Sequence, residues 1–289
     1  MHNNDTLQRF LFENSHVRGI FIHLGKSYQT ALNRYDYPEV IAEQLGQALV
    51  ASTLLSATIK FDGSLIMQTQ SSGLINMLVA QCSHDRHIRG LARWQETMLT
   101  EAAGNVYGEG HMTITIDNQK DERYQGIVSL SGGSLARSIE NYFKQSEQIQ
   151  THIWLAADHQ QAVGMLLQHL PGKEFDQDLW NRIEALGTTL TREEMLSLST
   201  VEVLYRLFHE EEVRLFEAEP ISFRCSCSRD KVANMLRALG SDEVEDILRE
   251  EGKISVGCEF CNQQYEFDAV DAAELFASDT ITPKSSVKH

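Results

Sequence analysis

Long apolar runs, basic residues and cysteines are all scarce in this sequence, and each scarcity excludes a class of protein. No stretch of the 289-residue chain approaches the roughly 18 to 20 consecutive apolar residues that cross a bilayer. The first residues, MHNNDTLQRF, carry acids and amides where a secretory signal would have a basic segment followed by an apolar run. We therefore expect a cytoplasmic protein with no membrane partner.

Basic residues are few relative to acidic ones, with 25 lysines and arginines against 41 aspartates and glutamates. The formal net charge of -16 creates a field that repels phosphate backbones and weakens the counterion release on which nucleic-acid binders depend. No nucleic-acid partner is expected. The length is sufficient for a main domain plus one or two smaller units.

Cysteines number only five, and their distribution along the chain is uneven. Cys82 stands alone after the apolar run Leu78–Ala80, which predicts a small buried side chain. The other four gather in the last quarter of the chain at spacings typical of metal ligands. In a chain without a secretory signal, that pattern favours metal or redox chemistry over a permanent disulfide framework.

Residues 1–175 mix helix and strand patterns and are predicted to form one α+β core domain. A long core helix begins at Tyr37-Pro38 and continues to Ile59, with proline in the first turn, where its missing N–H costs little. The strand patterns come as hairpins, which predicts hairpin-built sheets without helical crossovers. The predicted elements are a hairpin of 59–61 with 65–69 across Asp62-Gly63, a hairpin of 112–116 with 124–130, helices at 134–148 and 160–170, and a strand at 151–156.

Residues 176–221 change to short successive helices and are predicted to be a metastable helical linker. Leu179, Ile183 and Leu186 form one apolar stripe, Thr191 and Glu194 make a capping box, and Val201, Leu204 and Phe208 suggest a third helix. Helices this short are unstable alone in water, so the segment depends on its neighbours. An ordinary helical subdomain packed on the core explains the same pattern equally well.

Residues 222–276 are predicted to form a small C-terminal zinc-binding domain, followed by a disordered tail at 277–289. Ser228 and Ser241 are expected to cap two helices, and strands are expected around Ile254–Val256 and Tyr265–Phe267. About 50 residues with so few large apolar side chains ordinarily require a covalent or metal cross-link to fold.

The candidate metal ligands are Cys225, Cys227, Cys258 and Cys261, in the pattern Cys-x-Cys followed by Cys-x-x-Cys. Four thiolates complete a tetrahedral zinc shell and leave no open position for substrate or water, so a catalytic zinc is excluded. The same thiolates are the form of cysteine that attacks oxidants, and neighbours this close in sequence can join locally. A permanent structural zinc and a redox switch both remain open on chemical grounds.

No motif of an enzyme is specific enough to assign. His209-Glu210 begins like a zinc-protease helix, but position 213 is Val213, not the second histidine of that pattern. Gly104, Gly108 and Gly110 do not match a phosphate-binding loop and indicate turns. We therefore expect no enzyme and no catalytic residues. A zinc-ribbon adaptor for nucleic acid or a protein partner, and a hydrolytic or redox enzyme in the first domain, are the alternatives.

The cysteine segments FRCSCSRDK at 223–231 and VGCEFC at 256–261 closely resemble the redox switch of the 33 kDa heat-shock chaperone family. The resemblance extends over nearly the whole chain. Further similar segments, in the same order, are Tyr37-Pro38 with its helix, GEGHMTITID at 108–117, YQGIV at 124–128, YFKQSEQ at 142–148, GMLLQ at 164–168 and FHEEEV at 208–213.

This resemblance implies an ATP-independent holdase chaperone that is inactive while its four cysteines bind one zinc ion. It further implies that oxidation joins Cys225 to Cys227 and Cys258 to Cys261, releases the zinc, and unfolds the small domain and the linker. The implied partners are unfolding client proteins, together with a second copy of the chain in an activated homodimer. The implied setting is oxidative stress in the cytoplasm.

Overall fold

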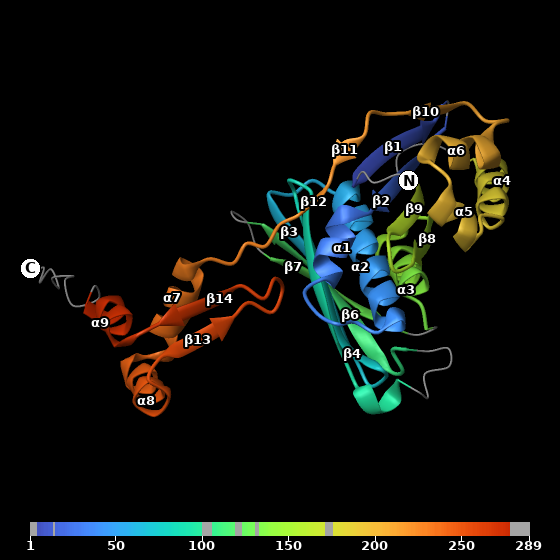
Figure 1. Ribbon diagram of the computed structural model, residues 1–289. Coiled ribbons are helices and arrows are strands. Elements are labelled where there is room, and N and C mark those ends of the chain that lie inside the picture. The colour runs from blue at the N-terminus through green and yellow to red at the C-terminus, as the bar shows by residue number, and fades with distance from the viewer. Residues whose placement is uncertain are drawn as a thin grey trace, which may run out of the picture. The chain divides into compact units, whose positions relative to one another are not determined.

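The computed structural model divides the chain into two compact units, with the boundary between Arg224 and Cys225 (Figure 1). It describes residues 5–13, 15–99, 106–118, 123–130, 133–170 and 176–277. Of the tail predicted at 277–289, only Ala277 falls within the described residues, where it ends a helix. The first unit is described here, and the second with the cysteine site that it contains.

Two sheets, built mainly from antiparallel hairpins, form the first unit. One has the order β10-β1-β2-β9-β8, with β11 also paired to β1. Its strands are β1 (Thr6–Phe12), β2 (Val17–Leu24), β8 (Thr151–Ala157), β9 (Ala162–His169), β10 (Val213–Leu215) and β11 (Glu219–Pro220). The other has the order β12-β5-β4-β3-β6-β7 and consists of β3 (Gly63–Ser71), β4 (Ile75–Ser83), β5 (His87–Trp94), β6 (Gly110–Asn118), β7 (Tyr124–Ser129) and β12 (Ser222–Phe223). The predicted α+β class is confirmed.

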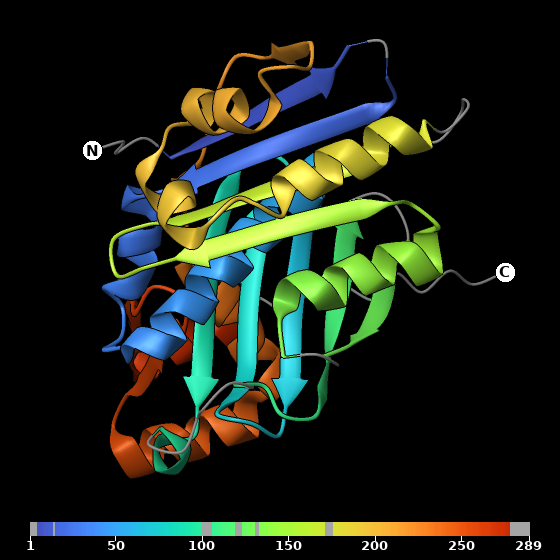
Figure 2. The same cartoon turned by 90° about the vertical axis from the view of Figure 1, so that its right-hand side faces the viewer.

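Helix α2 (Glu39–Thr58) lies between the two sheets and packs against strands of both (Figure 2). Among the described residues it is the one helix long and apolar enough to cross a membrane, but most of it is buried as the core helix of this unit. A Cβ atom at Gly46 would lie 2.9 Å from Tyr28 and Ala157, so glycine permits the close approach of helix and sheet. The other helical segments before β8 are α1 (Lys26–Leu32), η1 (Glu96–Met98), α3 (Leu135–Tyr142) and the π-helical turn η2 (Phe143–Glu147).

The helix predicted at 160–170 is wrong, because this segment forms β9 in the middle of the first sheet. Its residues alternate between two apolar environments: Leu166 faces the core around α2, whereas Val163 and Met165 face the opposite side of the sheet. A strand that is buried on both faces has an uninterrupted apolar run, and periodicity cannot distinguish such a run from a buried helix.

The hairpin predicted across Asp62-Gly63 is also wrong. Helix α2 continues to Thr58, and residues 59–61 form the connection into β3, which pairs with β4 and β6 instead. Glycine is required here for a different reason: a Cβ atom at Gly63 would lie 2.0 Å from the Asp117 carbonyl oxygen of β6. By contrast, the hairpin predicted from 112–116 and 124–130 is confirmed as β6 and β7.

Three helices cover the face of the first sheet that points away from α2: α4 (Gln177–Gly187), α5 (Arg192–Ser197) and α6 (Thr200–Phe208) (Figure 2). The predicted capping box is confirmed, because Thr191 and Glu194 exchange side-chain and backbone hydrogen bonds at the start of α5. Val201 is 60% exposed, so the buried stripe of α6 consists of its neighbours Val203, Leu204, Leu207 and Phe208.

Beyond Phe208 the chain becomes extended, a change that the helical pattern did not predict. Strands β10 and β11 add to β1 at the edge of the first sheet, and β12 then pairs with β5 of the second. Glu219 forms ion pairs with Arg9 of β1 and, at 3.4 Å, with Arg86 beside β5. We call residues 176–223 the connector; it is attached to both sheets.

His152 of β8 ties the connector helix α4 to the rest of the unit. Its imidazole lies 3.0 Å from Glu184 of α4 and 3.6 Å from Glu140 of α3, and stacks on Trp180 of α4 at 5.5 Å between ring centroids. Burial lowers the pKa of His152, but the two carboxylates outweigh it, so the pKa lies above its ordinary value.

We expect attachment of α4 to weaken with rising pH. A histidine whose pKa is raised on folding contributes its stabilisation fully below the unfolded value of about 6.5 and loses it as pH rises through the folded pKa. Hydrogen exchange of the α4 amides, corrected for intrinsic rates, should show lower protection at pH 8.5 than at pH 6. The variant His152→Gln should lose this dependence, whereas His159→Gln on the exposed β8–β9 turn should keep it. Equal pH dependence in both variants would contradict the assignment.

Candidate metal centre

The second unit is a small α+β fold around a thin core. It contains α7 (Arg229–Leu239), α8 (Ser241–Glu251), the strand pair β13 (Ile254–Gly257) and β14 (Gln264–Phe267), and α9 (Ala269–Ala277). Its buried apolar residues are Ala233, Leu236, Val244, Ile254, Phe267, Ala272 and Leu275. A core of this size supports only marginal stability.

Ser228 caps α7 as predicted, with its hydroxyl accepting the backbone N–H of Lys231 at 3.2 Å. The cap predicted at Ser241 is wrong. Gly240 occupies the N-cap of α8 with a positive φ of 105°, and the Ser241 hydroxyl turns to the Asp242 carboxylate at 3.3 Å. Glycine adopts this backbone angle without a Cβ clash, and so it links the two helices directly.

The four candidate ligands meet at one point of this unit. Cys225 and Cys227 lie on the segment that leads into α7, and Cys258 and Cys261 lie on the turn between β13 and β14. Their four sulfur atoms all lie within 4.8 Å of one another. The shortest separations join the two segments, at 3.6 Å between Cys225 and Cys258 and 3.4 Å between Cys227 and Cys261.

The β13–β14 turn folds tightly around its own pair of sulfurs. The Asn262 N–H donates to the Cys258 carbonyl at 2.8 Å, and Asn262 adopts the left-handed region at φ 57°. Backbone N–H groups of Phe260 and Cys261 donate to the Cys258 sulfur, and that of Gln263 donates to the Cys261 sulfur. Such donors stabilise sulfur as thiolate, the form that binds a metal.

A second contribution comes from Tyr265 of β14, whose hydroxyl donates to the Cys227 sulfur at 3.1 Å. This hydrogen bond, together with burial, raises the pKa of Tyr265 to about 12, so the phenol stays protonated and remains a donor. Partners of this kind orient ligand atoms and tune a metal site. The sequence pattern indicated Tyr265 only as a strand residue.

Two of the four sulfurs, those of Cys258 and Cys261, resist ionisation in this cluster. Burial raises the pKa of Cys258, and burial together with the neighbouring sulfurs raises the pKa of Cys261 to about 12. Ionisation of the cluster therefore requires a compensating cation. In a tetrahedron with bonds of about 2.3 Å, neighbouring sulfurs lie roughly 3.8 Å apart, which is close to the two shortest separations of 3.6 and 3.4 Å. The donor set and its spacing fit zinc.

Arg229 is a further residue that cysteine spacing could not reveal. It lies over the ring of Phe267 at 4.1 Å, forms an ion pair with Asp271 at 2.7 Å and donates to the Glu266 carbonyl at 2.6 Å. One side chain thus joins the start of α7, next to Cys227, to both β14 and α9.

Cys82 lies in the first unit and takes no part in this site. It is fully buried within β4, as predicted, and accepts a hydrogen bond from the Ser56 hydroxyl at 3.2 Å. Burial raises the pKa of its thiol, which makes it a poor nucleophile.

The comparisons with known proteins agree with this geometry. The model of the family described as Hsp33 protein matches residues 5–268. The chain belongs to the Hsp33 family. It is 51% identical to the 33 kDa chaperonin of Nitrosococcus oceani over the full length of both chains. It is 44% identical to that of Methylobacillus flagellatus, with 99% of each chain covered.

A solved Hsp33 structure shares the fold. The crystal structure of the 33 kDa chaperonin from Thermotoga maritima matches with a TM-score of 0.84 and 24% sequence identity, and the match covers 97% of this chain and 100% of that one. The relatives are thus named as chaperonins, and none of these names indicates an enzyme.

We expect the Tyr265→Phe variant to bind zinc about tenfold more weakly than the unmodified chain, because the ring remains but the donor to Cys227 is lost. Competition with a zinc chelator on the reduced chain measures the affinity. Cys258→Ser should lose zinc almost completely, and Cys82→Ala should bind it like the wild type. An unchanged affinity in Tyr265→Phe would show that its hydroxyl does not support the site.

Proposed function

We propose that this protein is a redox-regulated, ATP-independent holdase chaperone. In the proposal, Cys225, Cys227, Cys258 and Cys261 bind one zinc ion in the reduced, inactive state. Oxidation forms the disulfides Cys225–Cys227 and Cys258–Cys261, after which the second unit and the connector lose structure and unfolding clients bind. The supporting observations are the sulfur cluster, the thin core around it and the surface that the connector covers.

The observation that carries the proposal is the apolar sheet face beneath the connector. Eight of its side chains are buried against α4, α5 and α6: Phe10, Phe12, Val17, Phe21, Ala156, Val163, Met165 and Leu167. Phe12, for example, packs edge to face on Phe208 of α6 at 5.1 Å between ring centroids. Each phenylalanine buries about 150 to 250 Å². Release of the connector would thus expose an apolar patch larger than a soluble monomer ordinarily shows.

The connector helices depend on this docked position. Each has eleven residues or fewer, below the length at which an isolated helix is stable in water. Once detached, they would lose helical structure, and the entropy gained would oppose their return.

Chain continuity links the sulfur cluster to the connector. Strand β12 pairs Phe223 with Ile88 of β5, and the Arg224 N–H donates to the Ile88 carbonyl at 3.1 Å. Cys225 is the next residue. When the second unit is folded, the C-terminal end of β12 continues into an ordered structure. If that unit unfolded, β12 would continue into a disordered chain. Because β12 has only two paired residues, it would then separate easily from β5.

The chemistry of the switch belongs to the four sulfurs. Bound zinc would supply the positive charge that keeps the sulfurs as reactive thiolates. Each disulfide would form when two thiolates give up two electrons, which together with two protons from solvent reduce one hydrogen peroxide to two waters. Pairing within each segment removes all four ligands and leaves the two segments free to separate, whereas pairing between segments would keep them joined.

Several features of the setting are part of the same proposal. A cytoplasmic location would keep the cysteines reduced until oxidants accumulate. Activated chains would form a homodimer. The net charge of -16 would oppose their association into larger assemblies, even though their apolar surface is exposed. Client proteins would be recognised through their own exposed apolar segments.

The test follows zinc content, free thiols and chaperone activity together. We expect two equivalents of peroxide under mildly unfolding conditions to consume four thiols, to leave Cys82 reduced, and to switch on suppression of client aggregation as zinc is lost. Peptide mapping should identify the pairs Cys225–Cys227 and Cys258–Cys261. Full activity in a chain that retains its zinc would refute the proposal.

Glu219→Gln should make activation easier, because Glu219 holds the connector to Arg9 and Arg86. These pairs are partly exposed, so we expect a loss of about 1 kcal/mol and an about fivefold larger population of released connector. Activation at a given peroxide concentration should be faster, with zinc affinity unchanged in the reduced chain. Glu217→Gln is the matched control, since Glu217 is exposed and forms no ion pair among the described residues. Identical kinetics in the two variants would contradict this role.

A further inference from the structure

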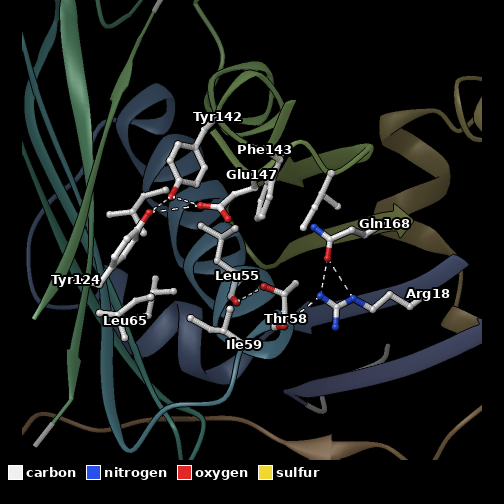
Figure 3. Close-up of a pocket in the computed structure, with 13 residues that line it drawn as sticks. Arg18, Leu55, Thr58, Ile59, Leu65, Tyr124, Tyr142, Phe143, Glu147 and Gln168 are labelled. Carbon is white, nitrogen blue, oxygen red and sulfur yellow. Dashed lines mark hydrogen bonds between the residues drawn. The ribbon is translucent and has the colours of Figure 1, made fainter. Parts of the chain in front are cut away.

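A cavity of about 330 Å³ opens in the first unit at the C-terminal end of α2 (Figure 3). Strands β3, β6 and β7 of the second sheet form one side, and α3 with its π-helical turn forms another. Strands β2 and β9 of the first sheet complete it. The cavity thus lies where the two sheets diverge, and its volume is at the lower end of the range for small-molecule sites.

The walls of the cavity are mainly hydrocarbon, whereas its polar groups gather at two places. Side chains from four elements supply the apolar surface, among them Leu55, Ile59, Leu65, Ile116, Phe143 and Ile149. One polar group consists of Arg18, Thr58 and Gln168, and the other of Tyr124, Tyr142 and Glu147 (Figure 3). A ligand that fits has an apolar body and at least one polar end.

Positive charge at the Arg18 end is only partly compensated. Its Nε donates to the Gln168 side-chain oxygen at 3.1 Å and its Nη2 to the Thr58 carbonyl at 3.1 Å. Among the described residues it forms no ion pair, and the two N–H groups of its Nη1 have no acceptor. Thr58 ends α2, whose dipole offers about half a negative charge. A net positive charge therefore remains beside an apolar wall.

The surroundings of Arg18 add to this charge. The pKa of nearby Arg9 is lowered by burial and by the charges of Arg86 and Arg18. Glu219 compensates Arg9 and Arg86 through its two ion pairs, but it forms none with Arg18. Arg18 is partly exposed and has no carboxylate partner among the described residues, so its guanidinium is available to the carboxylate of a ligand.

The Glu147 end differs because its charge is already satisfied. Tyr142 donates to the Glu147 carboxylate at 2.8 Å, and the Tyr124 hydroxyl lies 2.8 Å from that of Tyr142. Burial and these hydrogen bonds raise the pKa of Tyr142, so its phenol stays protonated. An anionic group would be repelled by Glu147 and attracted to Arg18, which fixes the orientation of a bound ligand.

We propose that this cavity binds a small anionic amphiphile, of the class of medium-chain fatty acids, with its carboxylate on Arg18. The two N–H groups of Nη1 would donate to the carboxylate, and the acyl chain would lie along the apolar wall. The site belongs to the first unit and is separate from the cysteine cluster, so binding requires neither oxidation nor loss of zinc.

Calorimetric titration of the reduced, zinc-loaded full chain with hexanoate, octanoate and decanoate, each below its micellar concentration, tests the proposal. Each buried methylene should tighten binding by about fourfold until the cavity is filled. Decanoate should bind at least about tenfold more tightly than decanol, which has the same chain without the charge. Absence of decanoate binding, or equal affinity for decanol, would overturn the proposal.

Two variants locate the site. Arg18→Gln should remove the preference for decanoate over decanol, and Ile116→Trp should weaken both ligands by filling the cavity. Arg214→Gln, an exposed arginine on β10 that pairs with Glu13 at 2.9 Å, should bind as the wild type does. Circular dichroism and zinc content confirm that each variant is folded. Decanoate binding that is unaffected in both folded site variants would also overturn the assignment.

Discussion

The mutual repulsion of four sulfur atoms held within 4.8 Å is the constraint on which the second unit depends. Partial burial and neighbouring sulfurs raise the pKa of Cys258 and Cys261, and a cation at the centre of the cluster would stabilise the thiolates together. The surrounding fold offers few other sources of stability. Seven buried apolar side chains, of which Phe267 is the one aromatic ring, and the contacts of Arg229 are its main apolar and polar supports. The binding free energy of a metal at this site would therefore be comparable to the folding free energy of the whole unit.

The connector, in contrast, is stabilised mainly by apolar packing against the first sheet. Its helices are too short to persist alone, yet they bury large aromatic side chains against the first sheet, and Glu219 and His152 add ionic contacts. These contacts stabilise the helices only while they are packed on the sheet. The connector helices cover one apolar face of the first sheet, and α2 covers the other. Val163, Met165 and Leu167 form the outward face of β9 beneath the connector helices, so this strand is apolar on both of its faces over most of its length.

Several local features were predictable because short-range chemistry decides them. The capping box of Thr191 and Glu194, the cap at Ser228 and the β6–β7 hairpin follow from neighbouring residues. The errors arose where distant residues decide. Residues 160–170 became a strand because α2 and the connector bury both of their faces. Gly63 serves a close approach to β6, and Gly240 replaced Ser241 as a cap because α7 and α8 join without a spacer.

The sequence by itself determined the family, the α+β class and the four cysteines that form the candidate zinc site, because ligand type and spacing are local properties. Only the tertiary structure decided which surface the connector covers, that Tyr265 donates to a sulfur, and that Arg18 lies beside an apolar cavity without an ion-pair partner among the described residues. Each of these depends on contacts between residues far apart in the chain. In the first unit such contacts are set by the packing of two sheets around one helix, and in the second by the meeting of two cysteine segments, and no local pattern encodes either.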